Sequence, residues 1–354
     1  MKKYISIIIG IVIISVSSCT EDFSLSENSD TFFHVSVNKT ALPVWVKGNT
    51  KSNKIIIYIN GGPGLTSIDL AKMDMFNWSE NLENYYAIAY YDQRGTGNAQ
   101  GTMDVSSLTI DQYVKDLNAI ISVIKDKYNN PQIFLMSHSF GSAIATNYLL
   151  TDNLQDNITG WISIDGAFNF DYDLQWVYRR DFLINIANEE INEGNTIDYW
   201  QEALQWTNNN LEISTREQKN QWSRYVYSSR VNLIPLEEAS SDFGAYLGVG
   251  FASSYNAFPA YTSTNLITVS RHLNMDVEGD NYINSVSQID IPTLLIWGRY
   301  DDLIPPELGY DVFNNLGTNN SEKYFSLFEK SSHEPYISDQ EKFKNEVSLF
   351  LDKF

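Results

Sequence analysis

The stretch QIFLMSHSFGSAIATNYLL, residues 132–150, decides how this chain folds. It begins with a short apolar run, Gln132 to Met136, of the kind found in a strand buried on both faces. The residues from Ser142 to Leu150 have the character of an apolar helix. Between the two stands Ser-His-Ser-Phe-Gly, residues 137–141. The segment therefore predicts a strand, a sharp turn and a helix, in that order.

The turn itself carries a chemical signal. G-x-S-x-G between a strand and a helix forms a nucleophile elbow, in which a strained turn lifts the serine Oγ above the sheet at the helix N-terminus. Small residues flank that serine because the strand and helix backbones pass close together. Here the pattern is S-x-S-x-G, with Ser137 in place of the first glycine. Ser139 is therefore a candidate nucleophile, and the alternative is an ordinary serine in a solvated loop.

The same alternation of strands and helices continues on both sides of the elbow. Further strands are predicted at 32–37, 42–46, 54–59, 85–91, 161–164, 293–297 and 324–328, and further helices at 111–127 and 341–351. The first two strands read as a leading antiparallel pair. Strands that alternate with helices indicate an α/β fold with a mostly parallel central sheet flanked by helices.

One long segment breaks this alternation. Between residues 171 and 285 the strand signal vanishes, and the chain is helical in character and rich in Trp, Tyr, Asn and Glu. This segment is interpreted as a helical cap inserted after the sixth core strand. The remaining α/β core then has two parts, residues 31–170 and residues 286–354.

A serine at its ordinary pKa is a weak nucleophile, so it needs a base, which a carboxylate orients. In a fold with this elbow the chain order is serine, acid, histidine. His333 follows the last predicted strand and lies C-terminal to plausible acids. Asp301, after the penultimate strand, is the preferred acid; Asp302 is the near alternative and Asp165 the distant one. For His34, His138 and His272 an ordinary structural role is expected.

A glycine-rich loop completes the candidate site. Asn60-Gly61-Gly62-Pro63-Gly64 follows the strand at 54–59, where a loop can turn a backbone N–H toward the serine. The predicted oxyanion hole has the N–H of Phe140 as one donor and that of Gly62, or Gly61, as the other.

Composition excludes several other functions. The 354 residues include 24 Lys and Arg against 44 Asp and Glu, and the formal charge of −20 repels nucleic-acid phosphates. The single cysteine and the lack of an H-E-x-x-H pair argue against a zinc site. Gly95-Thr96-Gly97 and the residues that follow lack the sixth-position glycine and the distant acid of a dinucleotide-binding motif.

The N-terminus reads as a targeting segment. Lys2-Lys3 precedes a thirteen-residue, mostly aliphatic stretch, Tyr4 to Val16, which is shorter than the about 20 residues of a membrane span. Val16-Ser17-Ser18-Cys19 resembles a bacterial lipobox. We expect residues 1–18 to be a signal peptide, Cys19 to be acylated and residues 19–30 to form a tether. The predicted location is the cell envelope, as a membrane-anchored lipoprotein facing the periplasm or the exterior; an ordinary secretory signal is the alternative.

Together these motifs resemble the proline iminopeptidase branch of the α/β-hydrolases. The matching pieces, from about residue 55 to 336, are Asn60–Gly64 (family H-G-G-P-G), Asp92-Gln93-Arg94-Gly95 (family D-Q-R-G), the Ser139 elbow, and Gly298-Arg299-Tyr300-Asp301 with Pro305 (family G-R-Y-D-x-x-x-P). The resemblance implies an α/β-hydrolase fold, removal of an N-terminal residue from peptides without metal or organic cofactor, and a cap whose glutamates bind the free amine. It also favours Asp301 over Asp302.

The chain departs from this family at several positions. Asn60 replaces a histidine, Ala99 a serine and Ser137 a glycine. In the cap, Val226 stands where family members often carry an amine-binding glutamate. Glu189 and Glu190, or Glu202, are the candidates to supply that charge, and a solvated helix face is the alternative for each.

The sequence thus predicts a serine hydrolase that acts through Ser139, His333 and Asp301 and an acyl-enzyme. Its expected substrates are small peptides from which it releases N-terminal residues. One alternative is an esterase or amidase on a small non-peptide substrate. The alternative from another class is a non-catalytic surface lipoprotein that uses the fold for binding. No nucleic-acid partner and no cofactor are expected, and the membrane is a partner only through the lipid anchor.

Overall fold

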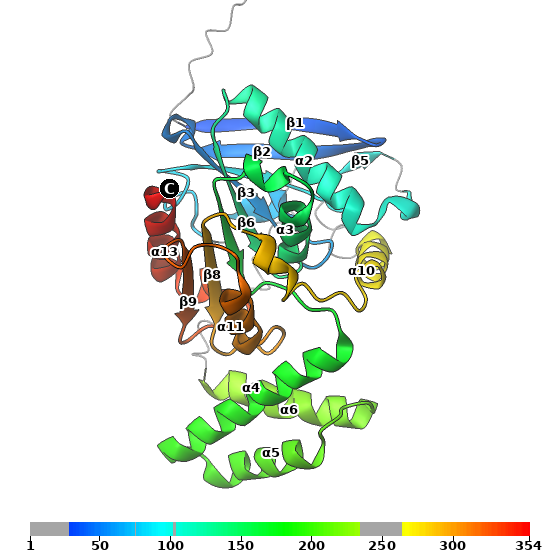
Figure 1. Cartoon of the computed structure of the whole chain (residues 1–354), viewed down its shortest axis with the longest axis vertical. Coiled ribbons are helices and arrows are strands. Elements are labelled where there is room, and N and C mark those ends of the chain that lie inside the picture. Colours follow the sequence, from blue (N-terminus) through cyan, green and yellow to red (C-terminus); the bar gives the residue numbers. More distant parts are fainter. Residues whose placement is uncertain (1–27, 75, 102–103, 234–263) are drawn as a thin grey trace, which may run out of the picture.

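A nine-stranded sheet forms the centre of the computed structural model, which describes residues 28–74, 76–101, 104–233 and 264–354 (Figure 1). Along the sheet the strands follow the order β1-β2-β4-β3-β6-β7-β8-β9, and the short β5 pairs with β2. β1 to β2 and β2 to β4 are antiparallel, whereas every pair from β4 to β9 is parallel. The strands are β1 (Ser29–Val37), β2 (Thr40–Gly48), β3 (Lys54–Ile59), β4 (Ala87–Tyr91), β5 (Gln100–Gly101), β6 (Gln132–His138), β7 (Gly160–Ile164), β8 (Thr293–Gly298) and β9 (Lys323–Phe328).

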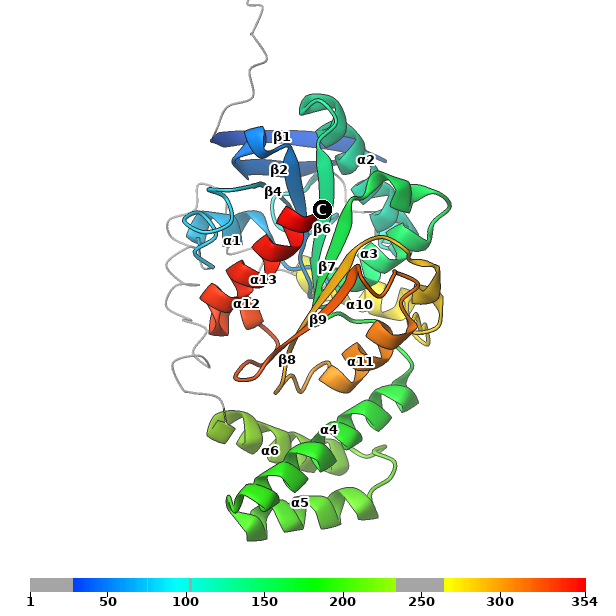
Figure 2. The same ribbon diagram turned by 60° about the vertical axis from the view of Figure 1, so that its left-hand side comes forward.

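Helices cover both faces of this sheet. Figure 2 shows α1, α12 and α13 on one face and α2 and α3 on the other. The helices in the described residues are α1 (Ile68–Met73), α2 (Ile110–Lys127), α3 (Gly141–Leu150), α4 (Tyr172–Glu193), α5 (Ile197–Asn209), α6 (Arg216–Leu233), α10 (Thr264–Asp276), α11 (Pro306–Asn315), α12 (Pro335–Ser338) and α13 (Gln340–Lys353), with short 3₁₀ turns at 50–52, 105–107, 154–157 and 285–288. The predicted α/β architecture is confirmed.

β3 explains why the central strands read as continuous apolar runs. Ile55, Ile57 and Ile59 pack into the hydrophobic core that α2 and α3 share, while Ile56 and Tyr58 pack into the core beneath α1 and α13. All five side chains are fully buried. Because both faces of the strand are covered, it shows no alternation of apolar and polar residues. Burial of each of these side chains contributes about 1.5–3 kcal/mol to the stability of the folded state.

A helical insertion follows β7, the sixth core strand, and precedes β8, as predicted. In Figure 1, α4, α5 and α6 lie together beyond the ends of the strands. They have an apolar cluster of their own, which includes Trp176, Phe182 and Trp200. Tyr178 on α4 ties the insertion to α11, because its hydroxyl donates to Asp311 at 2.6 Å. Residues 234–263 of the predicted cap lie outside the described residues.

The last helix of the insertion returns to the α/β core. Val269 and Leu273 of α10 belong to the same hydrophobic cluster as α2 and α3, and the Asp276 carboxylate accepts a hydrogen bond from the N–H of Ile110 at 2.7 Å. The sequence predicts one helical block, whereas the structure divides it between α4–α6 and a helix packed on the core. An apolar stripe along a helix does not by itself indicate which surface the helix will cover.

The sequence analysis misses three helices outside the insertion: the ten-residue α11 and the shorter α1 and α12. α1 and α12 have six and four residues, which is too short for a helical pattern to stand out. The strand predicted from Tyr85 begins at Ala87, and Tyr85 itself is exposed. Among the helices of the described residues, none combines the length and the apolar character that crossing a membrane requires.

Candidate active site

The turn between β6 and α3 has the geometry of a nucleophile elbow. Ser139 has φ of +53°, a left-handed conformation that side chains rarely adopt. Its N–H donates to the carbonyl of Ile164 at 2.9 Å, and its own carbonyl accepts from Ala167 at 3.0 Å. A Cβ at Gly141 would lie 2.2 Å from the carbonyl oxygen of Ile59, so only glycine allows α3 to approach β3 this closely. The strain at Ser139 is thus held in place by its neighbours on β3 and β7.

Ser137, the departure from the usual glycine, is accommodated by a buried hydroxyl network. Its Oγ lies 2.9 Å from the Oγ of Ser142 and accepts a hydrogen bond from the Trp161 indole at 2.9 Å. Ser142 in turn lies 2.9 Å from the Oγ of Ser163. Because each buried hydroxyl has a partner, the substitution leaves no unsatisfied polar group in the core.

The structure brings His333 and Asp301 into direct contact at the ends of β9 and β8. His333 Nδ1 lies 2.7 Å from Asp301 Oδ2, and the Asp301 carboxylate is fully buried. The other oxygen, Oδ1, accepts from the N–H groups of Leu303 and Ile304 at 2.9 and 3.0 Å. Among the three candidate acids, Asp301 is therefore the one hydrogen-bonded to His333, and its orientation is fixed by the backbone.

Two opposing effects set the pKa of His333. Burial lowers it, because a buried imidazolium loses hydration, while the Asp301 carboxylate and its hydrogen bond raise it. The balance leaves the pKa of His333 above its ordinary value of 6.5. The ring therefore keeps its proton to a higher pH than a free imidazole does, and it can both accept and return a proton.

His138 and Asp165 lie close to this pair and form hydrogen bonds with backbone groups next to it. The Nε2 of His138 lies 2.9 Å from the carbonyl oxygen of His333, and its Nδ1 lies 3.3 Å from the hydroxyl of Tyr336. Burial, with the charge of His333, lowers the pKa of His138 to about 3, so its ring is neutral, donating from Nε2 and accepting at Nδ1. This agrees with the structural role predicted for His138. Of the other two histidines, His34 lies on β1 and His272 on α10.

Asp165, the distant alternative acid, is fully buried at the end of β7. Its Oδ1 accepts from the N–H of Gly298 at 2.9 Å. Burial raises the pKa of Asp165 well above the ordinary value, and the nearby Asp301 charge raises it further, so Asp165 keeps its proton to a higher pH than an exposed carboxyl group does. Ligand atoms of His138, Asp165 and His333 lie within 4.8 Å of one another, but both ring nitrogens of His138 and the Nδ1 of His333 are engaged in the hydrogen bonds described above.

The Asn60–Gly64 loop lies directly against the elbow. A Cβ at Gly61 would stand 2.8 Å from the Cβ of Ser139, so glycine is required by this approach. The N–H of Gly61 donates to the side chain of Asn60 at 2.8 Å and is therefore occupied. The N–H groups of Gly62 and Phe140 have no acceptor in the described part of the chain. Of the two glycines considered, Gly62 is the one whose N–H has no acceptor among the described residues.

The Asp92-Gln93-Arg94 segment braces that loop. Gln93 donates from its amide to the carbonyl of Asn60 at 2.8 Å, and Asp92 accepts from the backbone of Ser67 at 2.8 Å. Arg94 forms a bidentate buried pair with Asp116, at 2.9 and 2.7 Å. Gln93 is thus the motif residue that is hydrogen-bonded to the loop, and none of the three lines the pocket beside Ser139.

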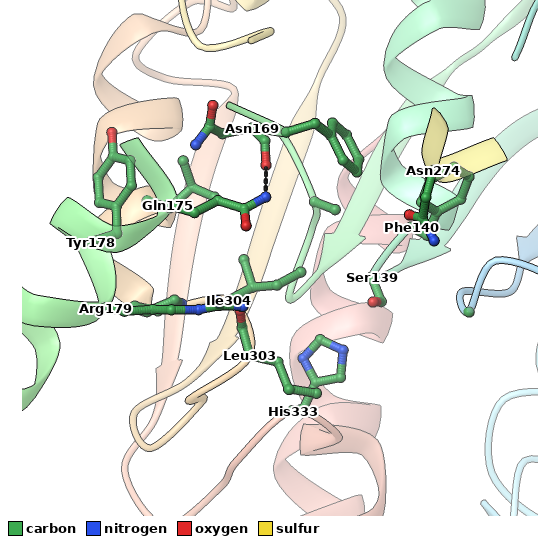
Figure 3. Close-up of a pocket in the computed structure, with 15 residues that line it drawn as sticks. Ser139, Phe140, Asn169, Gln175, Tyr178, Arg179, Asn274, Leu303, Ile304 and His333 are labelled. Atoms are coloured by element: carbon green, nitrogen blue, oxygen red, sulfur yellow. Dashed lines mark hydrogen bonds between the residues drawn. The ribbon is translucent and has the colours of Figure 1, made fainter. Parts of the chain in front are cut away.

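A pocket of about 270 Å³ opens above Ser139, between the core and the insertion. In Figure 3 the Ser139 hydroxyl and the His333 imidazole lie near one another at one end, with Tyr178 and Arg179 of α4 farther away. Its walls come from the elbow and oxyanion loops, the 303–308 segment and the insertion: Gly62, Ser139, Phe140, Ala167, Asn169, Phe170, Gln175, Tyr178, Arg179, Asn274, Leu303, Ile304, Pro305, Leu308 and His333. The wall residues of α4 are not anticipated by the sequence analysis; their only signal is their place just after the sixth strand.

The candidate amine-binding glutamates lie elsewhere. Glu189 pairs with Arg299 at 2.5 Å and lines a separate pocket between α4 and α11. Glu190 is buried within the insertion, and neither residue lines the pocket beside Ser139. The binding of a free amine by these residues stays a prediction. Cys19, the predicted lipid attachment site, lies outside the described residues.

Comparison with known proteins identifies the class to which this site belongs. The sequence pattern of the alpha/beta hydrolase fold matches residues 54–340, and the chain belongs to the α/β-hydrolase family. Among its relatives is a protein of Bacillus subtilis named "Probable aminopeptidase YbaC", 21% identical over 89% of this chain and 94% of the relative. A proline iminopeptidase of Saccharolobus solfataricus is 24% identical over 87% of each chain. An esterase structure from Exiguobacterium antarcticum shares the fold, with a TM-score of 0.58, 15% identity and coverage of 92% of this chain and 100% of the esterase.

Proposed function

We propose that this protein is a serine hydrolase in which Ser139 is the nucleophile, His333 the general base and acid, and Asp301 the carboxylate that orients His333. The observation that carries the proposal is the 2.7 Å contact of His333 with Asp301 at the edge of a pocket that Ser139 also lines. The proposal is also supported by the chain order of Ser139, Asp301 and His333, which follow the ends of three strands as expected of this fold.

In this mechanism Ser139 Oγ attacks the carbonyl carbon of the substrate while its proton passes to Nε2 of His333. The N–H groups of Gly62 and Phe140 stabilise the resulting oxyanion, and both are free of other acceptors in the described chain. The intermediate collapses to an acyl-enzyme as His333 protonates the leaving group. Water, deprotonated by His333, then releases the acid and restores Ser139.

The proposed substrates are small peptides, from which the enzyme releases the N-terminal residue. The support for this is that relatives named as an aminopeptidase and a proline iminopeptidase align over nearly nine-tenths of the chain. The pocket volume of about 270 Å³ fits a small acyl group. We further propose that Cys19 carries a lipid anchor, which would place the hydrolase at the cell envelope.

A second candidate function is an esterase or amidase that acts on a small non-peptide substrate. The observation that favours it is the pocket lining, whose described residues include no Asp or Glu to bind an N-terminal ammonium group. An esterase also shares the fold over the whole of its length.

The experiment that tests the proposed function is a panel of aminoacyl 4-nitroanilides, short peptides and small 4-nitrophenyl esters, assayed with the wild type and with Ser139→Ala. We expect turnover of at least one group and its loss in Ser139→Ala. The matched control is Ser137→Ala, two residues earlier, which should keep activity because its hydroxyl is buried in the core network. Equal rates in the wild type and Ser139→Ala would overturn the proposal.

A further inference from the structure

We propose that Arg179 binds a carboxylate carried by the substrate, so that the enzyme selects small substrates with an anionic group. This inference rests on the proposed function and defines its substrate class. Arg179 lies on α4 and lines the pocket that contains Ser139 and His333. Figure 3 shows it on the opposite side from Ser139, beyond Leu303 and Ile304.

The guanidinium of Arg179 is held in place by aromatic rings. Its central carbon lies 5.4 Å from the ring centre of Trp176 and 5.6 Å from that of Trp222, both of which are buried in the insertion. Cation–π contact of this kind orients a guanidinium without using its N–H donors. These ring contacts therefore hold the guanidinium in one orientation and do not occupy its N–H groups.

Most N–H donors of Arg179 have no acceptor among the residues that the structure describes. In the described part of the chain, Arg179 makes one hydrogen bond, from Nη2 to the carbonyl of Leu303 at 3.3 Å, and its buried Nε makes none. No described carboxylate lies within 4.0 Å of it, in contrast to Arg94 and Arg299, which pair with Asp116 and with Glu189. A guanidinium with unsatisfied donors beside a pocket matches a carboxylate, which accepts two parallel N–H bonds.

The charges around the pocket point to the same ligand. Arg179 is the one charged residue other than His333 among its described lining residues. Burial lowers the pKa of Arg179 while the charges of Asp302 and Asp301 raise it, and a guanidinium keeps its proton throughout. Because the chain as a whole is strongly acidic, with a formal charge of −20, a local cation is needed to retain an anionic group of the substrate.

The carboxylate could belong to either half of the substrate. It could be part of the acyl group that Ser139 receives, as in a monoester of a dicarboxylic acid. It could instead be the C-terminal carboxylate of a short peptide, which departs with the leaving group. Both present the same chemistry to Arg179, so the experiment has one arm for each.

In the acyl arm, kcat/KM is compared for 4-nitrophenyl hemiglutarate and 4-nitrophenyl pentanoate, which differ in the terminal carboxylate. In the leaving-group arm, proline release is compared for Pro-Gly and its C-terminal amide. We expect the anionic member to be preferred in one arm. Arg179→Met should lower kcat/KM for that member about 10- to 100-fold, mainly by raising KM. For the neutral member, kcat/KM should stay within about twofold of the wild-type value. Arg179→Lys should keep part of the preference.

Arg180→Met is the matched control, because Arg180 pairs with Asp181 and does not line the pocket. This variant should leave kcat/KM unchanged for both substrates of each pair. Equal losses for both members in Arg179→Met would show that Arg179 serves only to pack the insertion, and this would overturn the inference. Wild-type enzyme with no preference in either arm would also overturn it.

Binding of glutarate to Ser139→Ala, measured by titration calorimetry at low salt, separates this inference from the proposed function. We expect binding that is lost in the double variant Ser139→Ala/Arg179→Met. Glutarate binding that depends on Arg179, in a protein that hydrolyses none of the panel substrates, would leave the anion site standing and refute the hydrolase. Turnover of neutral substrates without Arg179-dependent binding of glutarate would support the hydrolase and refute the anion site.

Discussion

His333 Nδ1 and Asp301 Oδ2 lie 2.7 Å apart, although 32 positions separate the two residues in the chain. The carboxylate accepts this bond with one oxygen and two backbone N–H bonds with the other, so its plane is fixed. The imidazole that it binds is fixed in turn, with the proton on Nδ1 and Nε2 left for the serine. This contact is the geometric basis of the proposed mechanism.

Replacement of the acid tests that contact. Asp301→Asn should lower kcat by about 10⁴-fold, as in another well-studied triad, because an amide would hold the wrong tautomer of His333. Asp302→Asn should cost far less, since the carboxylate hydrogen-bonded to the ring is that of Asp301. Steady-state kinetics of the two variants measure the difference. Equal losses, or a larger loss in Asp302→Asn, would remove Asp301 from the mechanism.

The raised pKa of His333 predicts the pH dependence of catalysis. His333 must be neutral to accept the serine proton, so kcat/KM should fall as the pH drops through its pKa, with a midpoint above 6.5 in the free enzyme. His138 adds no second step there, because its pKa is lowered to about 3. A pH series from about 5 to 9 on one substrate provides the profile. A rate that stays constant down to the acid end of that series would contradict the assignment.

Asp165 should behave as a neutral acid. Because its pKa is raised in the folded protein, folding takes up a proton above the unfolded pKa, and stability falls as the pH rises. Asp165→Asn removes this effect and keeps the acceptor for Gly298, so it should gain stability over wild type more at about pH 8 than at about pH 5. The free energy of unfolding of the variant and the wild type, measured in urea at both pH values, tests this prediction.

The control for Asp165 is a variant without an acceptor. Asp165→Ala leaves the N–H of Gly298 without its acceptor and should lower the free energy of unfolding by about 1–3 kcal/mol at either pH. Activity of Asp165→Asn should remain within a few-fold of wild type. A loss comparable to that of Asp301→Asn would mean that Asp165 is also essential for catalysis and would contradict its assignment as a structural acid.

Cys19 is predicted to anchor the protein. Acylation there would move wild-type protein into a detergent phase, because each buried CH₂ of the chains contributes about 0.8 kcal/mol. Cys19→Ser should either stay unprocessed or become soluble, with hydrolase activity unchanged. Mass spectrometry of the mature N-terminus, paired with phase partitioning, is the measurement. An unmodified N-terminus downstream of Cys19 in a freely soluble protein would show an ordinary secreted enzyme.

The parts of the fold that depend on local pattern could be predicted from the sequence. β3 and β6 are buried on both faces, and their apolar runs predict them within two residues. Likewise, the positions of Ser139, Asp301 and His333 at strand ends follow from chain order. Elements of four to six residues, such as α1 and α12, have too few turns to show a period.

Features that depend on tertiary contact could not be predicted in this way. The choice of Gly62 over Gly61 rests on a hydrogen bond that Asn60 makes to its neighbour's N–H. The proximity of Asp165 to Asp301 depends on the pairing of β7 with β8. Arg179 is one of several charged residues on α4, and only the packing of that helix over Ser139 distinguishes it from Arg180. None of these contacts leaves a periodic signal in the chain.

The most direct test of the central claim is a fluorophosphonate adduct, mapped by peptide mass spectrometry on the purified full-length protein. The reagent reacts with a serine that an adjacent base activates. We predict a single adduct on Ser139, present in Ser137→Ala and lost in Ser139→Ala and in His333→Ala. An adduct on another serine, or no adduct on a folded protein, would contradict the assignment of Ser139, His333 and Asp301 as a catalytic triad.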